Sequence, residues 1–176
     1  MRLALALCLL PLAAAAQDAR ILSDRISAFE TGVICPPPSV GERIAPGTVA
    51  GVTHIIEEEP PFVSASHRVP AVLGIGFGTK AQSAEAFGID AVTVTVTHPP
   101  MGPEGVTTQS FETFIRGDSP SLSFYQFDYD YELLVGDWTM QAAKDGEVFY
   151  SASFRVVPPA MVPELASVCG YEDLLS

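Results

Sequence analysis

Almost the whole chain predicts β-structure. Apolar and polar residues alternate with a period of two rather than 3.6, the alternating segments are short, and Gly and Pro separate them. About eight or nine such segments occur, without the strand–helix alternation that builds a parallel sheet. We therefore expect an all-β fold, an immunoglobulin-like antiparallel β-sandwich with a short C-terminal helix.

The amino terminus has the pattern of a secretory signal peptide. Arg2 precedes an apolar run, residues 3–12, and the small residues 13–16 follow it. We place cleavage before Gln17, which predicts a periplasmic or secreted protein and leaves 160 of the 176 residues as a single domain, 17–176. The apolar run is too short to cross a bilayer and no second one follows, so no membrane span is expected.

The mature chain is acidic. Without Arg2, 8 Lys and Arg residues stand against 21 Asp and Glu residues, a net charge of −13. Nucleic acid and anionic lipid repel such a chain, because a protein that binds either must replace its counterions. We expect no nucleic-acid partner. An envelope protein or a small ligand that is neutral or basic is easier to bind.

Two cysteines remain after cleavage, Cys35 and Cys169. An exported protein meets oxidising conditions, so we expect them to form a disulfide that ties the first long strand to the C-terminal tail. A bridge that closes so long a loop stabilises the fold by about 4–5 kcal/mol in the chain-entropy model. The alternative is two free thiols, one of them reactive, although no histidine or basic cluster nearby would activate either.

The individual strands follow from the same alternation. In residues 91–97, three valines lie on one face and threonines lie on the other, which is typical of a strand with one buried face. Residues 121–133 alternate aromatic side chains with Gln, Asp and Glu in the same way. The expected strands before the closing hairpin are 26–35, 51–58, 62–68, 71–80, 91–97, 108–116 and 121–133.

The stretch 136–157 predicts a closing hairpin around Asp145 and Gly146. A two-residue turn there would place Met140 on the wrong face of the sheet, whereas a three-residue loop, 144–146, keeps the apolar residues of both strands together. We therefore predict a type I turn with Gly146 at positive φ in a G1 bulge. The pairs that this loop implies are Ala142–Val148, Met140–Tyr150 and Trp138–Ala152.

Two further segments have simple structural explanations. The three glycines of Leu-Gly-Ile-Gly-Phe-Gly, residues 73–78, lack the helix and the Gly-Lys-Ser/Thr of a phosphate-binding loop. We expect instead a flat strand face that a neighbouring aromatic ring or backbone approaches closely. Residues 163–169 predict the short helix, because Pro163 suits a first turn and Gly170 suits a C-terminal stop.

Three stretches, 69–82, 92–101 and 131–157, carry a set of motifs. They contain a Pro-Ala-x-Leu-Gly-x-x-Phe-Gly strand, a His-Pro-Pro element after a valine-rich strand, and a Glu-Leu-x-x-Gly-x-Trp hairpin. With these motifs, residues 69–157 resemble a family of bacterial exported domains of unknown function. The resemblance implies an immunoglobulin-like fold and no established activity.

Arg-Gly-Asp-Ser-Pro, residues 116–120, is expected to form a turn between two strands. Arg-Gly-Asp binds integrins when it tips an exposed hairpin, and Gly-Asp-Ser is similar to hydrolase nucleophile motifs. No histidine follows His98 to serve Ser119 from downstream, however, and turn chemistry explains all five residues. We therefore assign this segment a structural role.

The histidines are the first candidate metal ligands. If residues 51–58 and 62–68 form a hairpin, His54 and His67 face each other beside an acidic run. No metal-binding spacing supports a site there, so we expect both histidines to face solvent.

The carboxylates Asp128, Asp130 and Glu132 are the second candidate. They are two residues apart on an expected strand and therefore share one face. A row of carboxylates along a strand diverges instead of converging on one calcium ion. We expect a solvated face.

His98, Pro99, Pro100 and Met101 end a strand at one pole of the sandwich, where loops usually carry binding. We regard this segment as a possible interaction loop with an exposed Met101. The alternative is a rigid end to the strand.

The patterns of catalytic, phosphate, cofactor and metal sites are otherwise missing, so we assign no catalytic, cofactor-binding or metal residues. The expected function is an exported, non-catalytic binding or protein-interaction module. The alternative is a hydrolase or metal-dependent enzyme that uses His98, or the His54/His67 pair, with surface carboxylates. An exposed edge strand or an apolar loop patch would favour binding.

Overall fold

Two facing β-sheets form the body of the protein. The structure, a computed structural model, describes residues 19–37 and 39–175. The predicted signal peptide, residues 1–16, and its cleavage site before Gln17 lie outside the described residues. Within them, no helix is both long enough and apolar enough to cross a membrane.

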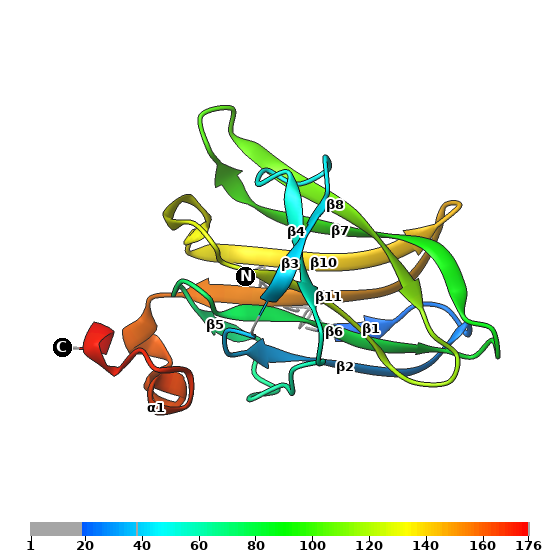
Figure 1. Ribbon diagram of the computed structural model, residues 1–176, viewed down its shortest axis with the longest axis horizontal. Helices are drawn as coiled ribbons and strands as arrows, with labels where there is room; N and C mark the ends of the chain where they lie inside the picture. The colour runs from blue at the N-terminus through cyan, green and yellow to red at the C-terminus, as the bar shows by residue number, and fades with distance from the viewer. Residues whose placement is uncertain (1–18, 38, 176) are drawn as a thin grey trace, which may run out of the picture.

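The large sheet has the strand order β1-β11-β10-β7-β8, and β5 also pairs with β11. The small sheet has the order β2-β6-β9. All pairs are antiparallel except β5 with β11, which confirms the predicted antiparallel sandwich. Figure 1 shows the long strands of both layers and the short C-terminal helices at one end. The elements are β1 (Ala19–Ile21), β2 (Ile26–Ile34), β3 (Ser39–Ile44), β4 (Val52–Ile56), β5 (Arg68–Pro70), β6 (Gly76–Ser83), β7 (Ile89–Met101), β8 (Val106–Ile115), β9 (Ser121–Gln126), η1 (Asp130–Glu132), β10 (Gly136–Lys144), β11 (Glu147–Val157), η2 (Pro159–Met161), η3 (Pro163–Leu165), α1 (Ala166–Cys169) and η4 (Glu172–Leu175).

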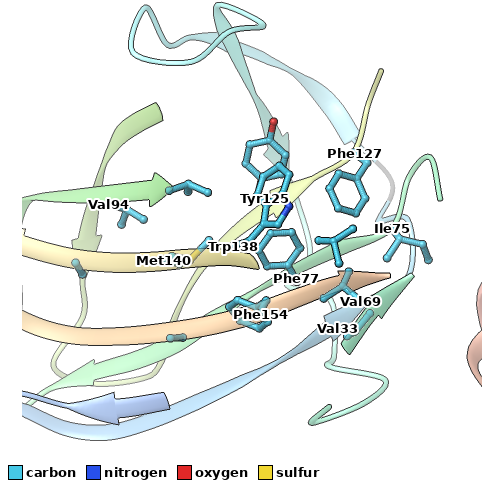
Figure 2. Packing of buried hydrophobic residues seen from close by; sticks show 14 of the residues in the cluster. Val33, Val69, Ile75, Phe77, Val94, Tyr125, Phe127, Trp138, Met140 and Phe154 are labelled. Carbon is cyan, nitrogen blue, oxygen red and sulfur yellow. The ribbon is translucent and has the colours of Figure 1, made fainter. Parts of the chain in front are cut away.

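The period-two alternation decides which side chains enter the space between the sheets. Val94 on β7 and Met140 on β10 are buried there, whereas the threonines between the valines of β7 lie on the outer face. Phe77 on β6 lies at the centre of this core, with its ring 5.6 Å from that of Trp138 and 4.7 Å from that of Phe154. Figure 2 shows these rings between the two layers. Their burial is the main stabilising term of the fold.

The hairpin of β3 and β4 pairs with neither sheet. It runs across the direction of the long strands, in cyan in Figure 1. Two backbone groups of its turn hold it to β8: Gly47 accepts a hydrogen bond from the N–H of Ser110 at 2.9 Å, and the N–H of Val49 donates to the side chain of Gln109 at 2.6 Å. The strand β3 was not expected from the sequence.

The turn of the closing hairpin differs from the prediction. Asp145 (φ 51°) and Gly146 (φ 84°) form a two-residue turn with positive φ at both positions, so the predicted three-residue loop is wrong. The register shifts between Ala142 and Ala143 instead, with Phe149 as the extra residue of β11. This bulge inside the hairpin restores the apolar face that we expected the loop to provide. The pairs beyond it are Ala142–Tyr150, Met140–Ala152 and Trp138–Phe154.

Two predicted strands are also wrong. In the segment 62–68, Ser64 forms an isolated bridge with Val33 and only Arg68 belongs to a strand, the short β5, while β4 pairs with β3 instead of with this segment. The strand expected over 121–133 ends at Gln126, and the chain then turns into the short 3-10 helix η1. Alternation continues in the sequence after that point, but the backbone is no longer extended.

The C-terminal tail covers one end of the sandwich. Its side chains Val162, Leu165 and Tyr171 are buried against the core. The predicted short helix is present as η3 and α1, and Gly170 ends it in the left-handed conformation (φ 73°). Cys35 and Cys169, 134 positions apart in the sequence, form a disulfide with their Cα atoms 5.0 Å apart.

The glycine-rich face of β6 has the predicted close neighbour. A Cβ atom on Gly76 would lie 3.4 Å from the ring of Phe124, and one on Gly78 would lie 2.7 Å from the Cβ of the same phenylalanine. A side chain at either position would push Phe124 and β9 away from β6. Gly76 and Gly78 therefore allow close strand packing, as expected, whereas Gly74 lies before β6 with φ 81°, so its place on the same strand face is wrong.

Candidate functional site

A cavity lies between the β3–β4 hairpin and the edges of the two sheets. Strand β8 is an edge of the large sheet, β9 is an edge of the small sheet, and the hairpin covers the opening between them. Its volume is about 170 Å³, and it is partly open to solvent. Both edge strands and the hairpin contribute polar side chains to its lining, among them Thr53, Gln109, Gln126, Asp128 and Glu132.

A chain of buried hydrogen bonds crosses from one sheet to the other beside this cavity. The side-chain amide nitrogen of Gln109 on β8 lies 3.0 Å from Nε2 of His98 on β7 and 3.2 Å from the hydroxyl of Tyr125 on β9. Tyr125 donates its hydroxyl hydrogen to Oε1 of Glu132 at 2.7 Å. All four side chains are buried, so each bond is shielded from water.

The backbone of the hairpin determines the orientation of the Gln109 amide and, through it, the tautomer of His98. The N–H of Val49 needs an acceptor, so it fixes the side-chain oxygen of Gln109 on its own side. The NH₂ group of Gln109 then donates to Nε2 of His98, and Nδ1 of His98 donates to the carbonyl of Pro99 at 2.8 Å. His98 is therefore the neutral tautomer with its hydrogen on Nδ1, and burial lowers its pKa.

Glu132 holds the loop after β9. Its Oε2 accepts hydrogen bonds from the backbone N–H groups of Asp128 (2.6 Å) and Tyr129 (3.0 Å), while its Oε1 accepts one from Tyr125. Burial raises the pKa of Glu132, and these three donors oppose the shift. Burial also raises the pKa of Tyr125, as does the neighbouring carboxylate. Glu132 therefore stabilises a non-extended backbone after β9, and this is why the predicted strand ends early.

Two polar atoms beside the cavity have no hydrogen-bond partner in the described part of the chain. They are Oγ1 of Thr53 on β4 and Oε1 of Gln126 on β9, and both are buried. The amide nitrogen of Gln126 donates to Oδ1 of Asp128 at 2.8 Å, which fixes the amide so that its oxygen points elsewhere. Buried polar groups are nearly always paired, so these two atoms indicate a place for a polar molecule.

The structure does not bring the predicted histidine pair together. His54 lies 2.8 Å from Oδ2 of Asp128, whereas His67 contacts Thr31 and stacks on Phe154 with the ring centres 5.1 Å apart. In residues 19–37 and 39–175, no group of three His, Cys, Asp or Glu side chains could hold a metal ion. The arrangement needed for the alternative metal-dependent enzyme is therefore not seen in this part of the chain.

The possible interaction loop at the end of β7 is only partly accessible. His98 and Met101 are buried, so the expected exposed Met101 is wrong, while Pro100 is exposed and Pro99 is half-buried. His98 packs against Trp138, with the ring centres 4.8 Å apart and the ring planes tilted by 34°. A binding role for Pro99 and Pro100 stays a prediction.

The Arg-Gly-Asp segment forms a closed turn. The guanidinium of Arg116 donates to both carboxylate oxygens of Asp118, at 2.8 and 2.7 Å, and lowers the pKa of Asp118 to about 2. The carbonyl of Gly117 accepts a hydrogen bond from Gln82. The pairing of Arg116 with Asp118 inside the turn agrees with the structural role assigned to this segment.

Sequence reasoning missed the buried polar chain. Gln109 lies at a position that the alternation of β8 assigns to the inward face, together with Phe111 and Ile115, and this was a usable signal. Glu132 offered no such signal, because its alternation placed it with Asp128 and Asp130 on the solvated face.

Comparison with known proteins agrees with this architecture. A family model described as a domain of unknown function (DUF3859) matches residues 25–156. An immunoglobulin-like protein from Pseudomonas aeruginosa has a crystal structure with a TM-score of 0.51 and 21% sequence identity, covering 82% of this chain and 100% of that chain. At this identity the likeness shows the fold alone. No curated protein matches the sequence. Because the family model spans more than half of the chain, the protein belongs to the DUF3859 family, and its fold is immunoglobulin-like.

Proposed function

We propose that the protein is an exported, non-catalytic binding module that contacts an envelope protein through the outer surface of the β3–β4 hairpin. The observation that carries this proposal is the exposure of apolar side chains on that hairpin. On β3, Ile44 is 83% exposed and Val40 60%. Neighbouring apolar side chains left in water on one element mark an interaction surface.

The position of the hairpin supports the same role. It is joined to the sandwich through its turn and through the contact of His54 with Asp128, and it adds no strand to either sheet. Covering the cavity does not require apolar side chains on the solvent side. Their exposure next to one another is what a contact surface would need.

The net charge of the chain indicates which kind of partner surface it can bind. A mature net charge of −13 repels acidic surfaces, so the partner surface is neutral or basic around an apolar centre. The charged residue between Val40 and Ile44 on β3 is Glu42, which is exposed. It would belong to the polar rim of such a contact.

Export is supported by two independent features. The N-terminal pattern of Arg2, an apolar run and small residues predicts a signal peptide cut before Gln17. The Cys35–Cys169 disulfide suits an oxidising compartment such as the periplasm. Intact mass of the protein recovered from the envelope, with and without reductant, tests both: we expect a chain that starts at Gln17 and gains two hydrogens on reduction. A chain that keeps residues 1–16 contradicts export by this route.

A site-specific photo-crosslinker tests the contact surface. Placed at Ile44, it should give a single adduct in the bacterial envelope. Placed at Phe87, it should give none, although Phe87 is 95% exposed on the loop between β6 and β7, away from the hairpin in Figure 1. The captured protein, once purified, should bind the wild type at least about tenfold more tightly than the Ile44→Ser variant. Equal adducts at both positions, or equal affinities, would contradict the proposal.

A further inference from the structure

We propose that the cavity under the β3–β4 hairpin binds a small organic molecule with a positively charged amine head group and a short apolar chain. This goes beyond the proposed function, because it concerns the inner side of the hairpin and needs no protein partner. Four features of the cavity carry the inference: its volume, its unpaired polar atoms, its charge and its aromatic lining.

The volume suits a ligand of a few atoms. A cavity of about 150 Å³ accommodates a benzene molecule, so the 170 Å³ of this cavity, which is partly open to solvent, cover about five or six non-hydrogen atoms. The part of a ligand that the cavity covers is therefore short.

The unpaired atoms call for hydrogen-bond donors. The side-chain oxygen of Gln126 can only accept a hydrogen bond, and the hydroxyl of Thr53 can accept one as well. Neither atom has a partner among the described residues, and leaving a buried polar atom unpaired costs about 1–3 kcal/mol. An ammonium group has three N–H donors and no acceptor, which matches this pair.

The charge around the cavity favours a cation. Asp128 and Glu132 both contribute to the lining, and no Lys or Arg in residues 19–37 and 39–175 forms an ion pair with either of them. Asp128 pairs with His54, and Glu132 is bound only by uncharged donors. Glu132 is buried and Asp128 is half-buried, so a positively charged ligand in the cavity gains from the negative charge of both side chains.

The rest of the lining suits the apolar part of such a ligand. Phe111, Leu122, Phe124 and Tyr125 line the same cavity. Their side chains can cover a short alkyl chain, and aromatic rings also attract ammonium groups. Arg43 reaches the cavity too, and its exposed guanidinium is the reason to include an anionic probe in the test.

Three probes with the same four-carbon chain separate the possible ligand classes: n-butylamine, butan-1-ol and butyrate. Each is titrated into the mature, disulfide-bonded protein, and amide shifts are followed by nuclear magnetic resonance. We expect n-butylamine to shift the amides of β4, β9 and the loop 127–132, with an affinity at least about tenfold higher than that of the other two probes. Equal binding of butan-1-ol overturns the need for a cation, and preferential binding of butyrate overturns its sign. If no probe shifts these amides, the cavity holds water alone and the proposal fails.

Two variants test whether n-butylamine binds in the cavity. Asp128→Asn keeps the shape of the side chain and removes its charge, and it should weaken n-butylamine binding about tenfold. Thr53→Val removes the unpaired hydroxyl and should weaken binding about threefold. Thr97→Val is the matched control, since Thr97 is exposed on the outer face of β7, and it should leave binding unchanged. Amide spectra of the unliganded variants show whether each is folded, and unchanged affinity in both folded cavity variants contradicts the site.

Discussion

The same two sheets enclose two regions of opposite character. Around Phe77, aromatic rings from both sheets pack at centre distances of 4.7–6.0 Å. Next to this aromatic core, Gln109, Tyr125 and Glu132 form a chain of hydrogen bonds between β8, β9 and η1. Tyr125 belongs to both regions, because its ring lies 5.1 Å from that of Trp138 while its hydroxyl joins the polar chain.

The stability that each region contributes depends on the geometry of its contacts to a different degree. Apolar packing is non-directional, so the aromatic core forms wherever alternation brings large side chains to one face. The polar chain stabilises the fold only if each donor meets an acceptor, because an unpaired buried group costs as much as a bond contributes. The aromatic core should therefore control global stability, and the polar chain should control the local structure that shapes the cavity.

Removing the central ring should give the largest effect. Phe77→Ala leaves a cavity between four aromatic side chains and should lower the free energy of unfolding by about 3–5 kcal/mol, measured by denaturant titration. Phe87→Ala is the matched control, with an expected change below about 0.5 kcal/mol, since the side chain is almost fully in solvent. Similar losses in the two variants would contradict the assigned core.

Truncation of the buried carboxylate should have a smaller and more local effect. Glu132→Ala leaves the hydroxyl hydrogen of Tyr125 and two backbone N–H groups without their acceptor, but it also removes the cost of burying a carboxylate, so we expect a loss of about 2 kcal/mol. Amide hydrogen exchange should rise at Asp128 and Tyr129 far more than in β10. Asp130→Ala, at an exposed neighbour, should change neither quantity. Uniform exchange increases would argue against a local role.

A substitution in the turn of the closing hairpin should lower the free energy of unfolding less than the substitutions in the aromatic core or the polar chain. Gly146→Ala forces a side chain into the left-handed conformation (φ 84°) and should cost about 1 kcal/mol. Gly41→Ala is the control, because its φ is not positive and an added Cβ would make an ordinary contact of 3.8 Å with Ile55. If the two substitutions cost the same, the two-residue turn is not the conformation in solution.

The smallest expected effect is a change of the unfolding free energy with pH, with a slope that corresponds to less than one proton taken up on unfolding. Burial lowers the pKa of His98 below its ordinary value of 6.5, so the unfolded chain takes up a proton first as the pH falls. The contribution of His98 to stability should therefore decrease from about pH 6.5 down to its folded pKa. Glu132 acts in the opposite direction, because its raised pKa contributes stability that is fully present below pH 4.5 and is lost as the pH rises from there through the folded pKa.

The difference in unfolding free energy between wild type and His98→Gln, followed against pH, isolates the contribution of His98. Nitrogen chemical shifts of the ring should also show the neutral Nδ1–H tautomer at pH 6.5. A ring that is largely protonated at that pH would contradict the hydrogen-bond chain from Val49 through Gln109.

Local pattern was a good guide to the strands and a poor one to the site. Val94 and Met140 were assigned to the correct face, and the short tail helix was expected where it is found. The alternation of the segment after Gln126 suggested a continued strand, yet Glu132 turns inward there. Its three hydrogen-bond donors come from β9 and from the loop itself, so the attraction that bends the chain exists only in the folded protein.

By itself, the sequence determined that this chain is all-β and which side of most strands is buried, because side-chain direction in a strand follows a local period of two. The presence of two cysteines in the predicted mature chain also allowed the Cys35–Cys169 disulfide to be predicted. Only the tertiary structure decided that β3 and β4 form a separate hairpin, that a bulge at Phe149 restores the register, and that the edges of β8 and β9 face each other across a polar cavity. These features depend on which distant edges meet, and strand pairing over long range is a property of the whole fold.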